Sequence, residues 1–314
     1  MNQQKILFIT PNSIGDAVLA TGLLAHLVET YPDAAITIAT GPAPADLFRA
    51  VPRLDQRIVM RKQSWKRHWL KFWMATVATR WNLVVDLRNS LFSRLLFAAR
   101  RAYRPKASGQ HKVIDNAATL QLTPPPSPKI WVDQTAENNA ARLFAAVGDK
   151  PVLAFGPAAN WYPKQWPIEH FIDLAKRLTA NDGLLPDAFI FIAAAPHERA
   201  MIEPLLKTIP AMRLIDACGQ DLLTVAACLK RCRLFVGNDS GLMHLSAAMG
   251  TKTLGLFGPG YEDIYRPWGP NGRFVRTPEK REILLARLTN PNQPNLMETL
   301  TVDTVLTAVR DFLM

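Results

Sequence analysis

The sequence predicts an α/β protein made of two doubly wound domains, each organised around a parallel sheet. Short apolar runs, of the kind that form strands buried on both faces, alternate along the chain with segments of helical periodicity. Such alternation is typical of βαβ units. A proline-rich segment, 123–128, interrupts the pattern, which then starts again. Because 314 residues suffice for two domains of ordinary size, we interpret the break as a linker or domain-edge loop.

The elements before the break form the first series. Its strands are expected at 5–10, 35–39, 57–60 and 83–86. A helix is expected over 17–28, since Pro32 stands just past its end. A second helix is expected around 65–77, as the crossover that leads into the strand at 83–86.

The elements after the break form the second series, and they divide the chain into domains at 1–148 and 149–301. The expected strands and helices are 135–147 (helix), 152–155 (strand), 168–179 (helix), 189–193 (strand), 198–208 (helix), 222–230 (helix), 233–236 (strand), 245–249 (helix) and 253–257 (strand). A last helix over 302–313 has an apolar face that can pack on either domain.

Composition and cysteine usage indicate a globular protein of a reducing compartment. About half of the residues are apolar and a fifth are charged. No run approaches the roughly 18 apolar residues of a membrane span, and the N-terminus lacks a signal-peptide core, so we expect a cytoplasmic location. Of three cysteines, Cys228 and Cys232 lie one helical turn apart without partners at metal-site spacing. We interpret them as buried structural residues.

The positive charge of the chain is concentrated in one segment. The net charge is +11, and residues 57–112 contain 14 lysines and arginines against a single acid, Asp86. Such a local field attracts an anionic surface or substrate. Trp65, Trp69 and Trp73 recur every four residues in this segment, with Lys66, Arg67 and Lys71 between them.

Two interpretations of this tryptophan helix remain open. Its tryptophans form either a core-facing stripe on a crossover helix or the apolar side of an interfacial helix whose lysines and arginines meet anionic lipid. Interleaved aromatic and basic residues also occur in single-strand nucleic-acid binders, but the chain contains no recognisable nucleic-acid module. We therefore expect no nucleic-acid partner.

The segment from Val236 to His244 carries the clearest functional signal. It joins an apolar strand to a helix of small residues through the turn Gly-Asn-Asp-Ser-Gly. The start of such a helix presents unpaired N–H groups that favour a phosphate, and Ser240 and His244 add side-chain donors one turn apart. The alternative is an ordinary βα turn in which Asp239 or Ser240 caps the helix.

Two further loops belong at the same edge of a parallel sheet, where ligands of doubly wound domains bind. In the loop 156–167, Lys164 can neutralise a phosphate. In the turn 12–16, Asp16 stands at a helix start, where it is either a capping residue or a general base. Because the chain has no Asp-x-Asp pair to hold a metal against a diphosphate, Lys164, His244 and backbone donors would have to meet that charge.

The three motifs together resemble glycosyltransferase family 9, the lipopolysaccharide heptosyltransferases. They are Asn12-Ser-x-Gly-Asp16, Lys164-Gln-Trp-Pro167 and Asn238-Asp-Ser-Gly-Leu-Met-His-Leu245, and the resemblance covers nearly the whole chain in order and spacing. It implies a GT-B fold, in which two Rossmann-like domains face a cleft. The first would bind the acceptor, the second the donor nucleotide, and the C-terminal helix 302–314 would pack back on the first.

The resemblance also implies an activity. Members transfer a heptose from ADP-heptose to a growing lipopolysaccharide core at the cytoplasmic face of the inner membrane, with inversion and without a metal or other cofactor. By position, Asp16 would be the base. The donor would be held by Ser13, Asn160, Lys164, Asp239, Ser240, Gly241, Leu242 and His244. The anionic, lipid-linked acceptor would suit the basic first half, including Lys66, Arg67 and Lys71.

The sequence departs from the family at two places. Ala159 and Asn160 stand where members commonly have hydroxyls for phosphate contact, and only Asn160 can donate a hydrogen bond. Pro196 stands where some members carry an acid that touches the nucleotide ribose, and Glu198 is a possible substitute. The alternatives are therefore a GT-B transferase or epimerase acting on another nucleotide sugar, or a non-catalytic protein that binds anionic lipid or nucleic acid.

Overall fold

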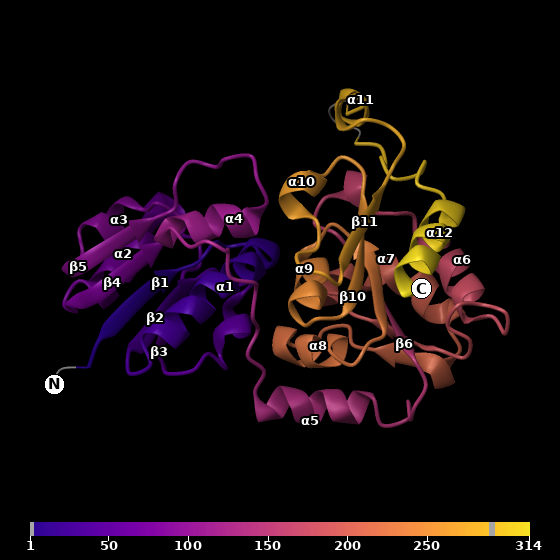
Figure 1. Cartoon of the computed structure of the whole chain (residues 1–314), viewed down its shortest axis with the longest axis horizontal. Coiled ribbons are helices and arrows are strands. Elements are labelled where there is room, and N and C mark those ends of the chain that lie inside the picture. The colour runs from indigo at the N-terminus through magenta and orange to yellow at the C-terminus, as the bar shows by residue number, and fades with distance from the viewer. Residues whose placement is uncertain (1–2, 289–292) are drawn as a thin grey trace. The chain divides into compact units, whose positions relative to one another are not determined.

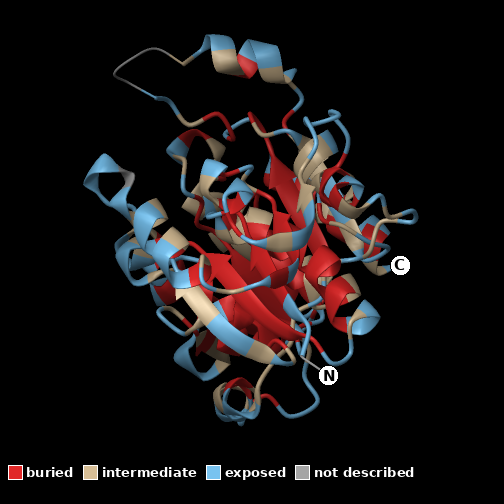
Figure 2. Cartoon of the chain, turned by 90° about the vertical axis from the view of Figure 1, so that its left-hand side faces the viewer, coloured by how far each residue is buried: buried red, intermediate tan, exposed pale blue. Residues whose placement is uncertain are grey.

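The computed structural model describes residues 3–288 and 293–314, and the chain divides into two compact units, Met1–Asp133 and Gln134–Met314 (Figure 1). Each unit has its own parallel sheet with helices packed on it. The buried residues are concentrated on the strands, whereas the helices are exposed on their outer sides (Figure 2). The predicted α/β class with two doubly wound domains is confirmed.

The sheet of the first unit has, within the described residues, the strand order β3-β2-β1-β4-β5, with all pairs parallel. Its strands are β1 (Lys5–Ile9), β2 (Ala35–Thr40), β3 (Leu54–Val59), β4 (Trp81–Asp86) and β5 (Ala98–Tyr103). The order reverses between β1 and β4, which makes that junction a topological switch point. The sequence did not predict β5, because exposed Arg100 and Arg101 interrupt its apolar pattern at the sheet edge.

The helices of the first unit leave the carboxyl ends of its strands. They are α1 (Ile14–Thr30), α2 (Arg67–Thr76), α3 (Leu91–Arg94) and α4 (Lys112–Ala117). One core lies under α2, where Phe72 packs with Leu7 and Ile9 of β1 and with Trp81 of β4. Helix α1 begins three residues before its predicted start, since Ser13 caps it.

The proline-rich segment 123–128 packs against the first unit. It crosses α1 at Gly22, where an added Cβ would stand 2.3 Å from Pro126 O and 2.7 Å from Ser127 O. The Lys129 N–H then donates to Thr21 Oγ1 at 3.0 Å. The segment is therefore an ordered edge of this unit, and a residue with a side chain at position 22 would displace it.

The boundary between the units differs from the expected one at 148/149. It falls at 133/134, because helix α5 (Gln134–Leu143) packs against α8 (Leu222–Leu229) of the second unit. Asn139 Nδ2 donates to Thr224 Oγ1 at 3.3 Å, and Glu137 pairs with Arg231 at 2.9 Å. These contacts assign α5 to the second unit.

The sheet of the second unit has the order β11-β10-β9-β6-β7-β8 in the part of the chain described, and all of its pairs are parallel. Its strands are β6 (Val152–Gly156), β7 (Phe189–Ile192), β8 (Leu214–Asp216), β9 (Leu234–Asn238), β10 (Lys252–Phe257) and β11 (Gly272–Arg276). The order reverses between β6 and β9. The unpredicted strands, β8 and β11, are the two edges, which are short or polar.

The remaining helices of the second unit cover both faces of this sheet. They are α6 (Ile168–Thr179), α7 (Arg199–Thr208), α9 (Gly241–Ala248), α10 (Glu262–Tyr265), α11 (Arg281–Ala286) and α12 (Val302–Leu313). Cys228 and Cys232 are buried free thiols, as predicted. Within residues 3–288 and 293–314, no helix combines the length and apolar character needed to cross a bilayer.

The C-terminal helix α12 differs from the expectation that it packs back on the first unit. It lies against α6 and β11 of the second unit. Val305 and Val309 are fully buried there and share one core with Leu174 and Leu178 of α6. The apolar face that the sequence showed is thus covered within the unit that contains it.

We predict that Gly22→Ala destabilises the protein. Alanine favours a helix over glycine, but its Cβ would meet backbone carbonyls of residues 126 and 127 at 2.3–2.8 Å. We expect the free energy of unfolding to fall by about 1–3 kcal/mol, measured by urea denaturation. If the free energy of unfolding instead rises, as the higher helix propensity of alanine alone would cause, the proline-rich segment is not packed on α1.

Candidate functional site

The candidate site of the second unit lies at the switch point between β6 and β9. Gly156 and Gly237 pair there at the carboxyl ends of the two strands. An added Cβ at Gly156 would stand 2.5 Å from the Phe235 ring, and one at Gly237 would stand 2.8 Å from Gly156 O. Glycine at both positions therefore lets the two strand ends approach closely, and the loops that follow diverge from one point.

The buried amide of Asn238 joins these two loops. Its Oδ1 accepts a hydrogen bond from Trp166 N–H at 2.9 Å, and its Nδ2 donates to Pro157 O at 2.7 Å. Trp166 is buried, and its Nε1–H donates to Leu300 O at 2.7 Å. One side chain at the end of β9 thus fixes both ends of the 157–166 loop, which carries Lys164.

Lys164 and Asp239 form an ion pair beyond the carboxyl ends of β6 and β9. Their Nζ and Oδ2 atoms are 3.2 Å apart, and the two side chains are only 17% and 12% exposed. Gly260, in the loop after β10, brings its backbone against the same carboxylate, since an added Cβ would be 2.8 Å from Asp239 Oδ2. Asp239 therefore interacts with a cation and does not cap α9, contrary to one of the two alternatives for this turn.

Helix α9 begins beside this pair, and the hydroxyl at its N-cap position makes no capping hydrogen bond. Ser240 is its N-cap by backbone conformation, but its side chain makes no capping hydrogen bond. Ser240 Oγ is buried and has no hydrogen-bond partner within the described residues. One turn on, His244 is buried, with its ring centroid 6.2 Å from that of Tyr265. A hydroxyl, the first N–H groups of α9 and Lys164 together suit an anion such as phosphate.

The predicted residues of this unit separate into two groups. Lys164, Asp239, Ser240, Gly241, Leu242 and His244 come together at the β6/β9 switch point and the start of α9. Asn160 is an exposed residue of the 157–166 loop. Glu198 follows β7, and its Oε2 accepts from Ala195 N–H at 2.8 Å at its own helix start. Among the residues that the structure describes, no three His, Cys, Asp or Glu side chains gather as metal ligands would.

The candidate site of the first unit lies at the corresponding place, after β1. Ser13 caps α1 by accepting from Asp16 N–H at 3.3 Å, and its hydroxyl donates back to Asp16 Oδ2 at 2.7 Å. The other oxygen, Oδ1, is buried and accepts no hydrogen bond from any residue described. Asp16 is thus held by one oxygen, while the other keeps its capacity to accept a proton.

Lys112 is a site residue that the sequence analysis missed. Its Nζ lies 3.8 Å from Asp16 Oδ1, and the two side chains are 14% and 28% exposed. Lys112 begins α4, which docks on α1 through a hydrogen bond from Asn116 Nδ2 to Leu19 O at 3.1 Å. The sequence shows Lys112 only as the last cation of the basic segment 57–112, and nothing in the sequence relates it to Asp16.

The neighbouring strand end is fixed by Asp86, the one acid of the basic segment. It is fully buried and accepts hydrogen bonds of 2.7–2.8 Å from the N–H groups of Arg88 and Ser90 and from the hydroxyls of Ser90 and Ser93. The guanidinium of Arg88 lies 4.5 Å from the centre of the Trp69 ring, and burial lowers the pKa of Arg88. Asp86 therefore has a structural role.

The tryptophan helix resolves into a core side and an exposed side. Trp69 and Trp73 are partly buried and pack against the core, as in the first of the two interpretations. Trp65 is 95% exposed. Arg67 and Lys71 are also exposed, whereas the side chain of Lys66 lies outside the described part of the structure.

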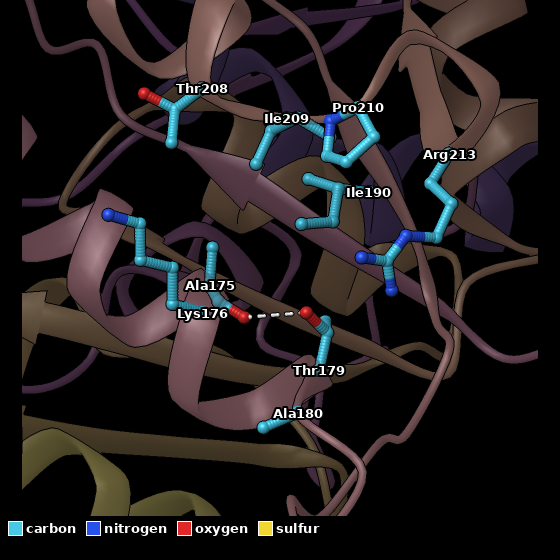
Figure 3. Close-up of a pocket in the computed structure, with 9 residues that line it drawn as sticks. All are labelled: Ala175, Lys176, Thr179, Ala180, Ile190, Thr208, Ile209, Pro210 and Arg213. Carbon is cyan, nitrogen blue, oxygen red and sulfur yellow. Dashed lines mark hydrogen bonds between the residues drawn. The ribbon is translucent and has the colours of Figure 1, made fainter.

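A pocket of about 270 Å³ lies elsewhere in the second unit (Figure 3). It is lined by the end of α6, by Ile190 of β7 and by residues 208–213, so it lies at the amino edge of the sheet. Lys176 and Arg213 stand at opposite sides of it (Figure 3). Because the Lys164–Asp239 pair is at the carboxyl edge, this pocket is separate from the candidate site.

Comparisons with known proteins agree with this architecture. A family model described as glycosyltransferase family 9 (heptosyltransferase) matches residues 58–291. The chain is 26% identical over 310 residues to lipopolysaccharide heptosyltransferase 2 of Escherichia coli K12, covering 87% of this chain and 88% of that protein.

Two solved structures extend the comparison to the fold. A glycosyl transferase family 9 protein of Veillonella parvula has a TM-score of 0.82 at 19% identity, covering 100% of this chain and 98% of that one. E. coli ADP-heptose lps heptosyltransferase II has a TM-score of 0.76 at 20% identity, covering 99% and 98%. With its two Rossmann-like parallel sheets, this chain has the GT-B class of fold.

We predict that Asn238→Ala destabilises the second unit. The change leaves Trp166 N–H and Pro157 C=O without their buried partner. We expect a loss of about 2–4 kcal/mol in the free energy of unfolding, measured by chemical denaturation. Asn271→Ala is the matched control, because that amide also donates to a carbonyl but is exposed. Equal losses for both variants would contradict the role assigned to Asn238.

Proposed function

This chain belongs to glycosyltransferase family 9 and is therefore a glycosyltransferase, and we propose that it moves a heptose from ADP-heptose to a lipopolysaccharide core acceptor with inversion at the anomeric carbon. The observation that carries the proposal is the grouping of Lys164, the unpartnered Ser240 hydroxyl and the start of α9 at the β6/β9 switch point. The names of the similar proteins from E. coli support heptose as the sugar and ADP as its carrier.

The donor diphosphate would bind beyond the carboxyl ends of β6 and β9. Lys164 would neutralise one phosphate, and the first N–H groups of α9 with Ser240 Oγ and His244 would bind the other. Asp239, freed in part from Lys164, would accept hydrogen bonds from sugar hydroxyls. Asn160 would supply the side-chain donor of its loop, and Glu198 a contact to the ribose. We propose that these groups stabilise the leaving diphosphate without a metal ion.

Asp16 would act as the general base on the acceptor. The acceptor hydroxyl would give its proton to Asp16 Oδ1 as its oxygen forms a bond to the anomeric carbon of the heptose. The bond from that carbon to the ADP oxygen would break, and ADP would leave with the electron pair. A single displacement of this kind inverts the anomeric configuration. Lys112, beside Oδ1, would keep the carboxylate in position, Ser13 would hold the other oxygen, and Ser13 would also contribute to donor binding.

The acceptor class explains the charge of the first unit. Lipopolysaccharide cores are anionic and anchored in a membrane, and residues 57–112 carry 14 lysines and arginines with one acid. We propose that the enzyme works at the cytoplasmic face of the inner membrane and that Lys66, Arg67 and Lys71 contribute to that contact. No nucleic-acid partner belongs to this proposal.

We predict that Asp16→Asn lowers the transfer rate by about 10²–10⁴-fold, because the amide cannot accept the proton. Binding of ADP, followed by calorimetry, should change little. The measurement is heptosyl transfer from ADP-heptose to a Kdo-bearing acceptor. Glu169→Gln, in the first turn of α6, is the matched control and should keep full activity. Retained activity in Asp16→Asn would remove the proposed base, and release of an epimerised sugar nucleotide by the parent protein would favour an epimerase.

We predict that Lys164→Ala weakens binding of ADP by about 10–100-fold, which corresponds to the loss of one charge-assisted contact. Lys176→Ala is the control, since that exposed lysine lies at the amino edge of the same sheet. Calorimetric titration with ADP measures both variants. An unchanged affinity in Lys164→Ala would place the diphosphate elsewhere.

A further inference from the structure

The first unit exposes an unusual group of large apolar side chains. Apart from Val59, the exposed large apolar residues described in this unit all fall between 65 and 97. Their exposed fractions range from 48% to 95%. They are Trp65, Leu70, Met74, Leu91, Leu95 and Phe97, and we call them the α2–α3 surface.

Leu70 and Met74 lie on α2 and Leu91 lies on α3, two helices that pack against each other. On α2, Phe72, Trp73 and Thr76 are directed to the core, whereas Arg67, Leu70, Lys71 and Met74 follow helical spacing and are exposed. The segment after β4 packs against α2, since the rings of Phe92 and Trp69 are stacked with centroids 6.1 Å apart. Leu91 and Leu95 flank Phe92 and are exposed.

Exposed positive charge accompanies these apolar residues along the chain. The lysines and arginines with exposed side chains in the same stretch are Arg61, Lys62, Arg67, Lys71, Arg80, Arg94, Arg100 and Arg101. The one acid between them, Asp86, is fully buried and takes up four hydrogen bonds. No acidic group is therefore exposed between residues 61 and 101 to balance the cations.

From these observations we propose that the α2–α3 surface docks on an anionic lipid bilayer, with Leu70, Met74, Leu91, Leu95 and Phe97 inserted among the acyl chains and exposed cations of the same stretch, such as Arg67 and Lys71, bound to headgroups. Exposed aliphatic side chains interspersed along the chain with exposed cations match the acyl and headgroup layers of an anionic membrane surface. The proposal rests on the membrane-anchored acceptor proposed above. It assigns membrane insertion to these exposed residues and not to Trp69 and Trp73, which pack against the core.

Other occupants match this surface less well. A second copy of the chain would bring together two stretches with exposed cations and no exposed acid, which like-charge repulsion disfavours. Single-stranded nucleic acid would need aromatic platforms for its bases, whereas four of the six apolar residues are leucine or methionine. Trp65, with its backbone at φ 56°, holds its indole almost wholly exposed, as an indole at headgroup depth requires.

The test is sedimentation of the full chain with vesicles of phosphatidylglycerol and phosphatidylethanolamine, compared with vesicles of phosphatidylcholine alone. The quadruple variant L70S/M74S/L91S/L95S should bind anionic vesicles at least tenfold more weakly. The variant R67Q/K71Q should lose about fivefold in partitioning for each charge removed. Unchanged thermal unfolding would show that these exposed substitutions leave the fold intact.

Matched controls come from the second unit. M212S/I283S removes apolar residues that are 80% and 51% exposed, and K176Q/R233Q removes two exposed cations. Both should bind vesicles like the parent. Equal binding by parent and α2–α3 variants, equal binding to both vesicle types, or a dimer in sedimentation velocity that L70S/M74S/L91S/L95S dissociates would each overturn the proposal.

Transfer to a deacylated, soluble acceptor separates this proposal from the proposed function. The variant L70S/M74S/L91S/L95S should keep full activity on that acceptor while losing vesicle binding. If the parent binds anionic vesicles through these residues but transfers no heptose, the docking surface stands and the proposed reaction fails. If the parent transfers heptose but does not bind the vesicles, the docking surface is wrong and the reaction stands.

Discussion

The buried amide of Asn238 is the interaction on which the second unit's site depends. It ends β9 and satisfies one N–H and one C=O of the loop that follows β6. Without these bonds the loop would have buried polar groups with no partner, which costs about 1–3 kcal/mol for each group. Because the loop is fixed at residues 157 and 166, Lys164 between them meets the Asp239 carboxylate at 3.2 Å. The Asn238 side chain at the end of β9 thus determines the position of the Lys164 ammonium group.

The first unit uses the same sheet topology for a different electrostatic arrangement. At its switch point a carboxylate takes the place of the cation, and Ser13 satisfies one oxygen while Lys112 lies beside the other. This leaves Asp16 oriented through one oxygen, while the other accepts no hydrogen bond from any residue described. The comparable oxygens of Asp86 are all used by backbone and hydroxyl donors, so burial and bonding separate a structural acid from a chemically available one.

Two packing contacts set the extent of the units. One forms at a glycine and the other at an apolar helix face. Gly22 leaves room for the proline-rich segment against α1, so the first unit extends to residue 133. Helix α12 covers its valines against α6, so the C-terminal end of the chain belongs to the second unit. In each case the packing buries apolar surface that would otherwise face water, and the favourable free energy of that burial holds the segment on its own unit.

The sequence by itself determined the α/β class, the strands with apolar runs such as 5–9 and 234–236, and the turn at 237–241 between a strand and a helix, because these depend on periodicity and on short-range turn chemistry. It could not find β5, β8 or β11, whose edge positions tolerate exposed polar residues. Only the tertiary structure showed that Lys112 lies beside Asp16 and that Asp239 pairs with Lys164. It also showed that the Ser240 hydroxyl makes no capping hydrogen bond. Trp69 and Trp73 pack against the core, whereas Leu91, Leu95 and Phe97 are exposed. Those facts depend on contacts between residues far apart in the chain, or on which side of a helix meets the core, and local pattern does not encode either.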